Sequence, residues 1–187
     1  NKSGKIGIKI YSPAGNEVFS TSQDVILSEG TPVATSFSLK KPELWSVDTP
    51  VLYTAEVSLS SDGKEYDKIS VPFGIRTLSF SAEKGFLLNG KSMKLKGGGV
   101  HHDNGLLGAA AIDRAEERKV ELMKANGYNA VRCAHNQVSE HFLDACDRLG
   151  MLVIHETFDQ WQKAKREQDY HQFFDEWSDW DLAASVR

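Results

Sequence analysis

Three groups of polar side chains stand directly after short apolar segments of the sequence. They are His101-His102-Asp103, then Arg132 with His135 and Asn136, and then His155-Glu156 with Asp159. The apolar segments resemble strands of a parallel sheet, and ligands in α/β folds bind at the carboxyl ends of such strands. One group alone could be structural, but three groups at one edge predict a functional site.

The combined chemistry of these groups favours a carbohydrate ligand. Imidazoles, a guanidinium, carboxylates and an amide supply many directed hydrogen bonds, and Trp161 adds an aromatic platform nearby. A sugar offers hydroxyl groups to the former and apolar ring faces to the latter. We therefore predict a site for a polyhydroxylated substrate.

Other chemistries fit the residues less well. Zinc is disfavoured because His101 and His102 are adjacent and point to opposite faces of a strand, and because no His-x-x-x-His or Cys-x-x-Cys spacing occurs. No Gly-x-Ser-x-Gly elbow is present, and Cys133 is expected to point into packing. Gly97-Gly98-Gly99 matches neither a P-loop nor a dinucleotide fingerprint. We expect no metal and no cofactor.

Composition excludes several classes of partner. The chain has 187 residues, is 40% hydrophobic and 26% charged, and carries a formal net charge of −4 without a dense Lys/Arg run. A nucleic-acid partner is therefore not expected. No apolar run reaches the length of a membrane span, so a membrane partner is not expected either. Cys133 and Cys146 lie in different predicted elements and are interpreted as buried free thiols.

The elements that position the polar groups begin near residue 85. Asn89-Gly90 predicts a hairpin, followed by a strand at 92–96 and by three glycines at a strand end, where the backbone could turn or approach a neighbour closely. Next come a helix with Asp113 as N-cap that ends at 126–127, a strand at 130–135, a helix capped by Ser139 and stopped by Gly150, and a buried strand at 151–154. This βαβαβ run predicts a parallel sheet, either open or the start of a barrel.

The first part of the chain has a different rhythm. Ile6, Ile8 and Ile10 alternate with other residues, a turn follows at 13–16, and further strands are expected at 33–39, 51–59 and 65–73. Turn signals at this spacing are typical of an antiparallel β-sandwich. The few strands, and the first one so near residue 1, suggest a sandwich without its opening strands.

Several motifs in this order resemble family 2 glycoside hydrolases. They are Leu44-Trp45-Ser46 with Thr49-Pro50-Val51-Leu52-Tyr53, Phe73-Gly74-Ile75-Arg76, Phe86-Leu87-Leu88-Asn89-Gly90-Lys91, Gly99-Val100-His101-His102-Asp103, Cys146-Asp147-Arg148-Leu149-Gly150, Glu156-Thr157-Phe158-Asp159, and the run from Leu122 to Arg132. The resemblance spans nearly the whole chain and is greatest to the bacterial β-galactosidase branch. β-Glucuronidase and β-mannosidase are the neighbouring specificities.

The resemblance implies a retaining exo-β-glycosidase on a (β/α)8 TIM barrel, with one glutamate as acid/base and one as nucleophile. Their carboxyl groups lie about 5–5.5 Å apart in such enzymes. In the family these glutamates end the fourth and seventh barrel strands, so both are expected downstream of Arg187, and no catalytic residue is expected in this chain. The Asn-Glu pair at Asn16-Glu17 falls in a predicted sandwich hairpin and is interpreted as a coincidence.

The resemblance also assigns supporting roles. His102 and His135 would donate hydrogen bonds to sugar hydroxyls, with Asn136 beside them as a further substrate-binding residue. Arg132 would lie beneath the site and pair with a structural Glu156. Asp103 and Trp161 would support the site. Some family members bind magnesium through a Glu and a His, but the corresponding positions are Gln160 and Gln162 here, so a tight metal site is not expected.

By resemblance, residues 1–80 form an immunoglobulin-like β-sandwich that lacks its first strands, and residues 81–187 form the N-terminal part of the barrel, with about three β/α units. The chain would then be an internal fragment that hydrolyses nothing by itself. A homo-oligomer is possible by family analogy. Three alternatives stay open: a non-catalytic carbohydrate-binding or scaffold relative, β-glucuronidase or β-mannosidase specificity, and a metal-dependent barrel hydrolase.

Overall fold

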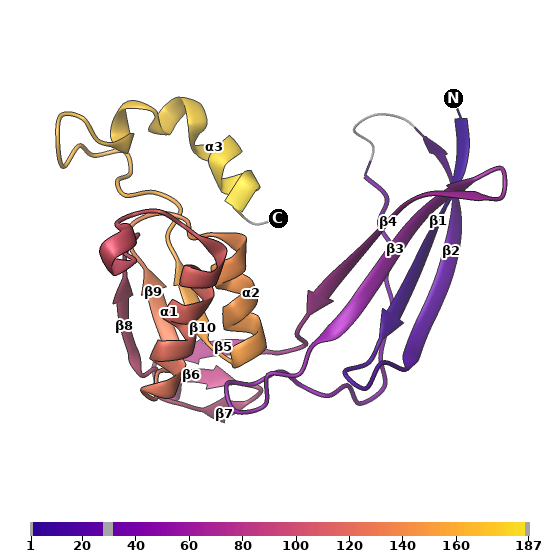
Figure 1. Ribbon diagram of the computed structural model, residues 1–187, viewed down its shortest axis with the longest axis horizontal. Coiled ribbons are helices and arrows are strands. Elements are labelled where there is room, and N and C mark those ends of the chain that lie inside the picture. Colours follow the sequence, from indigo (N-terminus) through magenta and orange to yellow (C-terminus); the bar gives the residue numbers. More distant parts are fainter. Residues whose placement is uncertain (1, 28–31, 186–187) are drawn as a thin grey trace. The chain divides into compact units, whose positions relative to one another are not determined.

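The chain folds into two compact units, and the division between them falls between Ser92 and Met93 in the sequence. The computed structural model describes residues 2–27 and 32–185 (Figure 1). The first unit is built from strands, and the second alternates strands and helices. The change of architecture lies between Ser92 and Met93, later in the chain than residue 85, near which the sequence rhythm changes. The expected domain boundary between residues 80 and 81 stays a prediction.

The first unit contains a four-stranded antiparallel sheet in the order β2-β1-β3-β4. Its strands are β1 (Lys2–Tyr11), β2 (Glu17–Leu27), β3 (Tyr53–Ser61) and β4 (Lys64–Phe73). The alternation predicted in the first strand is present: Ile10 is buried, whereas Lys5 and Lys9 on the other face are exposed. The turn predicted at 13–16 is also confirmed, and it joins β1 to β2.

One predicted strand of this unit is wrong. Residues 33–39 form no strand, and the whole segment 32–52 is irregular. Its apolar residues still make contacts, because the ring of Phe37 stacks on that of Phe19 with 5.0 Å between centroids. Alternating polarity indicates that one side of a segment can pack, but it does not supply a neighbouring strand for the backbone hydrogen bonds.

The motif around Trp45 packs a buried aromatic ring into the first unit. Trp45 is 1% exposed, and the Arg76 guanidinium lies over its ring at 4.8 Å from the centroid. A Cβ atom on Gly74 would lie 2.9 Å from the Trp45 side chain, so only glycine fits there without movement. The side-chain amide of Asn89 donates to the Trp45 carbonyl oxygen at 3.0 Å.

A small antiparallel sheet, β5-β6-β7, closes the first unit. It comprises β5 (Leu78–Ser81), β6 (Gly85–Leu88) and β7 (Lys91–Ser92). The hairpin predicted at Asn89-Gly90 is confirmed, with φ of 51° and 74° at the two residues, as a type I′ turn requires. The strand predicted at 92–96 is wrong beyond Ser92, where β7 ends.

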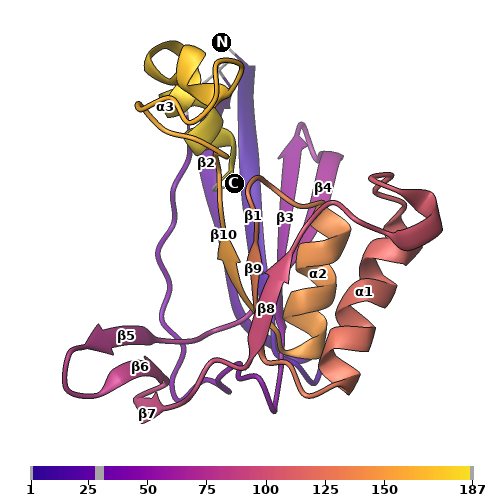
Figure 2. The same cartoon turned by 90° about the vertical axis from the view of Figure 1, so that its left-hand side faces the viewer.

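The second unit is built on a parallel sheet in the order β10-β9-β8, with two helices beside it (Figure 2). The sheet contains β8 (Gly97–Val100), β9 (Ala130–Cys133) and β10 (Leu152–His155), connected through α1 (Asp113–Ala125) and α2 (Glu140–Leu149). The βαβαβ prediction is therefore confirmed. The core between the sheet and the helices consists of Val120, Val131, Cys133, Phe142, Ala145, Cys146 and Met151.

Helix α2 begins and ends as predicted, but α1 does not begin as predicted. The Ser139 hydroxyl accepts a hydrogen bond from the Phe142 amide at 3.2 Å, and Gly150 ends the helix with φ of 78°. The N-cap of α1 is Ile112, without a side-chain cap, so Asp113 is not the cap. As the first residue of the helix, Asp113 still has its negative charge where the helix dipole favours it.

The three glycines form strand β8 instead of following one. A Cβ atom on Gly97 would lie 1.6 Å from the Ala130 carbonyl oxygen of β9, whereas one on Gly99 would meet nothing within 4 Å. The expected close approach is thus present at Gly97, but the expected place, at a strand end, is wrong. The glycine lets β8 pair tightly with β9.

Three further elements complete the described part of the chain. They are two short 3-10 helices, η1 (Gly105–Leu107) and η2 (Tyr170–Gln172), and a last helix, α3 (Phe174–Ser185). No helix among the described residues combines the length and apolar character needed to cross a membrane.

Candidate functional site

The ends of β9 and β10 bring together a guanidinium, a carboxylate and an imidazole. Arg132 pairs in register with Ile154, and Glu156 lies two residues further along, so both side chains project from the same face. Arg132 Nε donates to Glu156 Oε1 at 2.5 Å, and His135 Nδ1 lies 3.3 Å from Glu156 Oε2. Each carboxylate oxygen therefore has its own nitrogen partner. We call these three residues the strand-end triad.

The triad keeps Glu156 ionised. Burial by itself would raise the pKa of the Glu156 carboxyl, but hydrogen bonds and positive charge from Arg132, with a further contribution from His135, lower it below its usual range. About half of the Arg132 and His135 side-chain surfaces is exposed, against 24% for Glu156. The carboxylate is the least exposed member of the triad, and it holds the two nitrogen-bearing side chains, which are open to a ligand.

At the end of β8, the structure places His101 next to the triad. The His101 and His135 rings meet edge to face, with 5.5 Å between centroids. His102 is exposed and makes no hydrogen bond, ion pair or ring contact within residues 2–27 and 32–185. Both histidines follow the last residue of β8, and of the two only His101 makes a ring contact with the triad among the described residues. Contact of His102 with a sugar stays a prediction.

The remaining predicted residues occupy separate positions. Asp103 closes its loop by accepting a hydrogen bond from the Gly105 amide at 3.1 Å. Asn136 is exposed and makes no polar contact among the described residues. Asp159 is exposed, while the Nε2 atom of His155 is buried without a hydrogen-bond partner in the described part of the chain. Burial lowers the pKa of His155, so its ring favours the neutral form.

Trp161 belongs to an aromatic group that follows β10. Its ring meets Phe158 edge to face and lies 5.7 Å from Phe174, yet 64% of Trp161 is exposed. Phe158 is buried and stacks on Tyr170 at 4.7 Å. The Trp161 ring is therefore held by Phe158 and Phe174 while most of its surface is exposed to solvent.

The loop before η2 is closed by one carboxylate. Asp169 Oδ2 accepts hydrogen bonds from the backbone amides of Lys165 and Arg166 at 2.7 and 2.6 Å, and Oδ1 accepts from the amide of His171 at 3.1 Å. Burial would raise the pKa of Asp169, but these hydrogen bonds and the His171 ring lower it far below the usual range. Burial and the hydrogen bond to Asp181 raise the pKa of Tyr170 to about 12.

The metal alternative finds no support in the geometry. Within residues 2–27 and 32–185, no three His, Cys, Asp or Glu residues come together in a group that could hold a metal ion. The Gln160 side chain, at one of the positions compared with magnesium ligands, donates to the Lys163 carbonyl oxygen. The His135 ring is paired with Glu156 through its Nδ1 atom.

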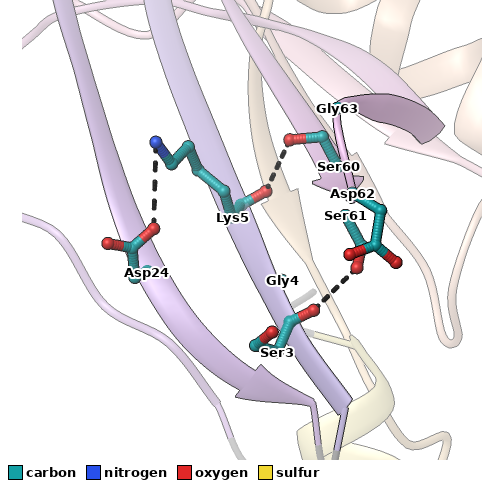
Figure 3. A pocket seen from close by; sticks show the side chains of 8 residues that line it. All are labelled: Ser3, Gly4, Lys5, Asp24, Ser60, Ser61, Asp62 and Gly63. Carbon is teal, nitrogen blue, oxygen red and sulfur yellow. Dashed lines mark hydrogen bonds and ion pairs between the residues drawn. The ribbon is translucent and has the colours of Figure 1, made fainter.

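A polar pocket of about 400 Å³ lies on the first unit (Figure 3). Several of its polar side chains are used within the sheet: Ser61 Oγ donates to the Ser3 carbonyl oxygen at 2.8 Å, and Lys5 lies 3.8 Å from Asp24. Ser60 likewise bonds to the Lys5 carbonyl oxygen. These contacts join β1 to its neighbours, so the strand-end triad is the stronger candidate for a site.

Fold and site together define the class of the protein. An all-β unit precedes a parallel βαβαβ unit whose strand ends carry the polar triad, and this edge is where (β/α) barrel enzymes have their active sites. Residues 1–76 match the family model "Glycosyl hydrolases family 2", and residues 81–181 match "Glycosyl hydrolases family 2, TIM barrel domain". The chain belongs to glycoside hydrolase family 2.

Individual relatives agree with the family. The β-galactosidase BoGH2A of Bacteroides ovatus is 45% identical over 145 residues, which cover 78% of this chain and 17% of that protein. A putative β-glucuronidase of Formosa agariphila is 37% identical over 88% of this chain and 16% of its own length. The crystal structure of a family 2 member from Bacteroides cellulosilyticus superposes with a TM-score of 0.89 and 48% identity, covering 98% of this chain and 24% of that one.

The comparisons confirm the fold class. The chain contains an immunoglobulin-like sandwich domain followed by the start of a TIM barrel, as the solved family members do. It spans about a sixth of the length of the two curated relatives. Relatives with the names β-galactosidase and β-glucuronidase both match, so the family is shown and the sugar is not.

Proposed function

We propose that this chain supplies the sandwich and the first barrel strands of a retaining exo-β-glycosidase that acts on terminal β-galactosides, with both catalytic glutamates outside residues 1–187. The observation that carries the proposal is the strand-end triad, in which Glu156 holds Arg132 and His135 at the edge where barrel enzymes bind substrate. The galactoside preference rests on the resemblance and on the β-galactosidase among the relatives.

The hydrogen bond of His135 determines how it can meet a sugar. With Nδ1 directed at the ionised Glu156, a neutral ring carries its proton on Nδ1 and presents Nε2 as an acceptor. It would then accept a hydrogen bond from a hydroxyl group and would donate one only when doubly protonated. This refines the expectation that His135 simply donates. Arg132, with its guanidinium half exposed, would place positive charge beneath the catalytic carboxylates and so favour the ionised form that the nucleophile needs.

Kinetics on the protein that contains this chain would test the substrate. Nitrophenyl β-galactoside, β-glucuronide and β-mannoside differ only in the sugar, so their kcat/KM values compare specificity directly. We expect the galactoside to lead by at least about tenfold, which corresponds to about 1.4 kcal/mol, close to the net contribution of one hydrogen bond. A leading glucuronide would replace our choice, and the named glucuronidases among the relatives make it the second candidate. Cleavage of none of the three would favour a carbohydrate-binding relative.

Two further measurements test the mechanism and the location of the glutamates. Proton NMR of the first-formed sugar should show the β-anomer, because a covalent intermediate inverts the anomeric carbon twice. Release of the α-anomer would rule out retention. The polypeptide of residues 1–187 should turn over no nitrophenyl glycoside, and measurable turnover by it would show that catalytic groups lie within this chain.

A further inference from the structure

A second polar cluster lies on α1, apart from the strand-end triad. Glu116, in the first turns of this helix, is only 4% exposed. Its Oε1 atom accepts from Asn104 Nδ2 at 2.6 Å and from Lys119 Nζ at 3.2 Å. A carboxylate at this depth is costly unless donors are held against it. The favoured conformation of the loop before α1 is therefore one that brings Asn104 to Glu116, while Lys119 is supplied by the helix itself.

Asn104 connects this carboxylate to the loop that follows β8. Its side-chain amide donates one hydrogen to Glu116 and the other to the Ala110 carbonyl oxygen at 3.1 Å. Its backbone amide donates to the Gly108 carbonyl oxygen at 2.8 Å, and its carbonyl accepts from the Leu107 amide. The Asn104 side chain thus connects the two ends of the loop from 104 to 110, and Glu116 fixes the position of that side chain.

Lys119 extends the cluster to the end of β8 itself. Its Nζ atom donates to Glu116 and also approaches the His101 carbonyl oxygen at 3.4 Å. The Lys119 side chain is 17% exposed, and its ammonium lies 6.0 Å from the centroid of the Phe142 ring in the core. The ammonium therefore joins a helix to the backbone of His101, whose ring contacts His135 of the triad.

We infer that Asn104, Glu116 and Lys119 form a positioning cluster for the strand-end histidines. The cluster fixes the backbone at His101 and the loop that begins with His102, and through the ring contact it limits where His135 can lie. None of the three residues would touch the substrate. Their catalytic effect rests on the proposed function, whereas their effect on the loop can be measured without it.

Variants of the protein that contains this chain separate these effects. Lys119→Met keeps the aliphatic stem and removes the ammonium, Lys119→Arg restores a cation, and Glu116→Gln removes the negative charge at nearly constant volume. The matched control is Arg114→Met in the same helix, where an exposed guanidinium pairs with Glu121 at 3.0 and 2.8 Å and, among the described residues, makes no hydrogen bond or ion pair with the loop. If Lys119→Met fails to fold, the double variant Glu116→Gln/Lys119→Met takes its place. It removes both charges, so neither is left buried without its partner.

The first readout is the kinetics of the best nitrophenyl glycoside. We expect Lys119→Met to lower kcat about ten- to a hundredfold, the usual effect of misplacing a group by about an ångström, with a smaller change in KM. Lys119→Arg should recover most of that loss, and Arg114→Met should match the wild type. Unchanged kcat and KM in folded Lys119→Met and Glu116→Gln would overturn the positioning role, even if the thermal midpoint fell.

The second readout is hydrogen exchange of the amides at 101–108. It should accelerate in Lys119→Met and Glu116→Gln and stay at the wild-type rate in Arg114→Met. Unchanged exchange would overturn the inference whatever the kinetics show. Accelerated exchange in a protein that cleaves none of the glycosides would support the loop-fixing role while the proposed function fails, so the two failures are distinguishable.

Discussion

Arg132 on β9 and Glu156 after β10 are joined by a 2.5 Å hydrogen bond between Nε and Oε1, across a gap of 24 residues in sequence. Parallel pairing makes this possible, because it places Arg132 beside Ile154 and so directs Glu156 to the same face. The second carboxylate oxygen lies near His135. A single carboxylate thus organises two groups that could face a substrate.

Replacing Glu156 by Gln should lower the stability of the folded protein at neutral pH. It should also reduce the loss of stability that follows acidification. The pKa of Glu156 is lower in the folded protein than in the unfolded chain, where a glutamate titrates at about 4.3. Its stabilising contribution is therefore present above that pH and is lost as the pH falls through the folded-state value. Urea midpoints of Glu156→Gln between pH 3 and 7 should show a smaller acid decline than the wild type.

Asp159→Asn is the control for this measurement, because Asp159 is exposed and lies three residues from Glu156 without a polar contact in the described ranges. It should follow the wild-type profile. An equal acid decline in Glu156→Gln and the wild type would contradict the role of this carboxylate.

Gly97→Ala should destabilise the second unit strongly. The new Cβ would lie 1.6 Å from the Ala130 carbonyl oxygen, so β8 must move away from β9. Overpacking against movable side chains costs about 1–3 kcal/mol, and a backbone obstacle should cost at least the upper end of that range. Gly99→Ala is the matched control, since its Cβ meets nothing within 4 Å. Equal urea midpoints for the two variants would refute the close approach.

The two thiols should be unreactive until the protein unfolds. Burial raises the pKa of Cys133 to about 11 and that of Cys146 further still, and both side chains lie in the core of the second unit. At pH 8 the Cys133 thiol is therefore almost entirely protonated, and the thiolate is the reactive form. A chromogenic disulfide reagent should label neither thiol in buffer and both in urea. Rapid labelling of the folded protein would contradict this packing.

Asp169→Asn should loosen the loop between β10 and α3. The substitution replaces an acceptor of three backbone amides by a group that has one acceptor atom and an NH2 facing those donors. Because the pKa of Asp169 is depressed, the wild-type loop should hold at neutral pH and weaken only in strong acid. Hydrogen exchange at 160–172 should rise in Asp169→Asn at pH 7. Glu167→Gln, exposed in the same loop, should leave exchange unchanged.

Local rules of sequence predicted the turns and helix ends well. Asn89-Gly90 and the Ser139 cap were predicted because each depends on a few adjacent residues, and the structure shows both. The strand at 33–39 failed because its partner would have to come from elsewhere in the chain. Asp113 failed as a cap because Asp serves equally well one position later, inside the first turn.

The site was only partly readable from sequence. Parallel strands bring their carboxyl ends together, so the meeting of Arg132 with Glu156 could be foreseen, and the structure shows the pair. The contact of His101 with His135 could not, because which of two adjacent histidines turns toward a neighbour depends on the backbone at the end of β8. Glu116 was missed for a similar reason: it looks like one more charge on a surface helix until Asn104 is placed beside it.

The strand order β10-β9-β8 bears on how the second unit is made in the cell. Spatial neighbours in this sheet are also consecutive along the chain, so each strand emerging from the ribosome finds its partner already synthesised. Translation at about 5–20 residues per second gives each strand-helix pair seconds to dock before the next arrives, far longer than helix or loop formation needs. The growing edge of the sheet can thus act as the template for each addition, and assembly can keep pace with synthesis.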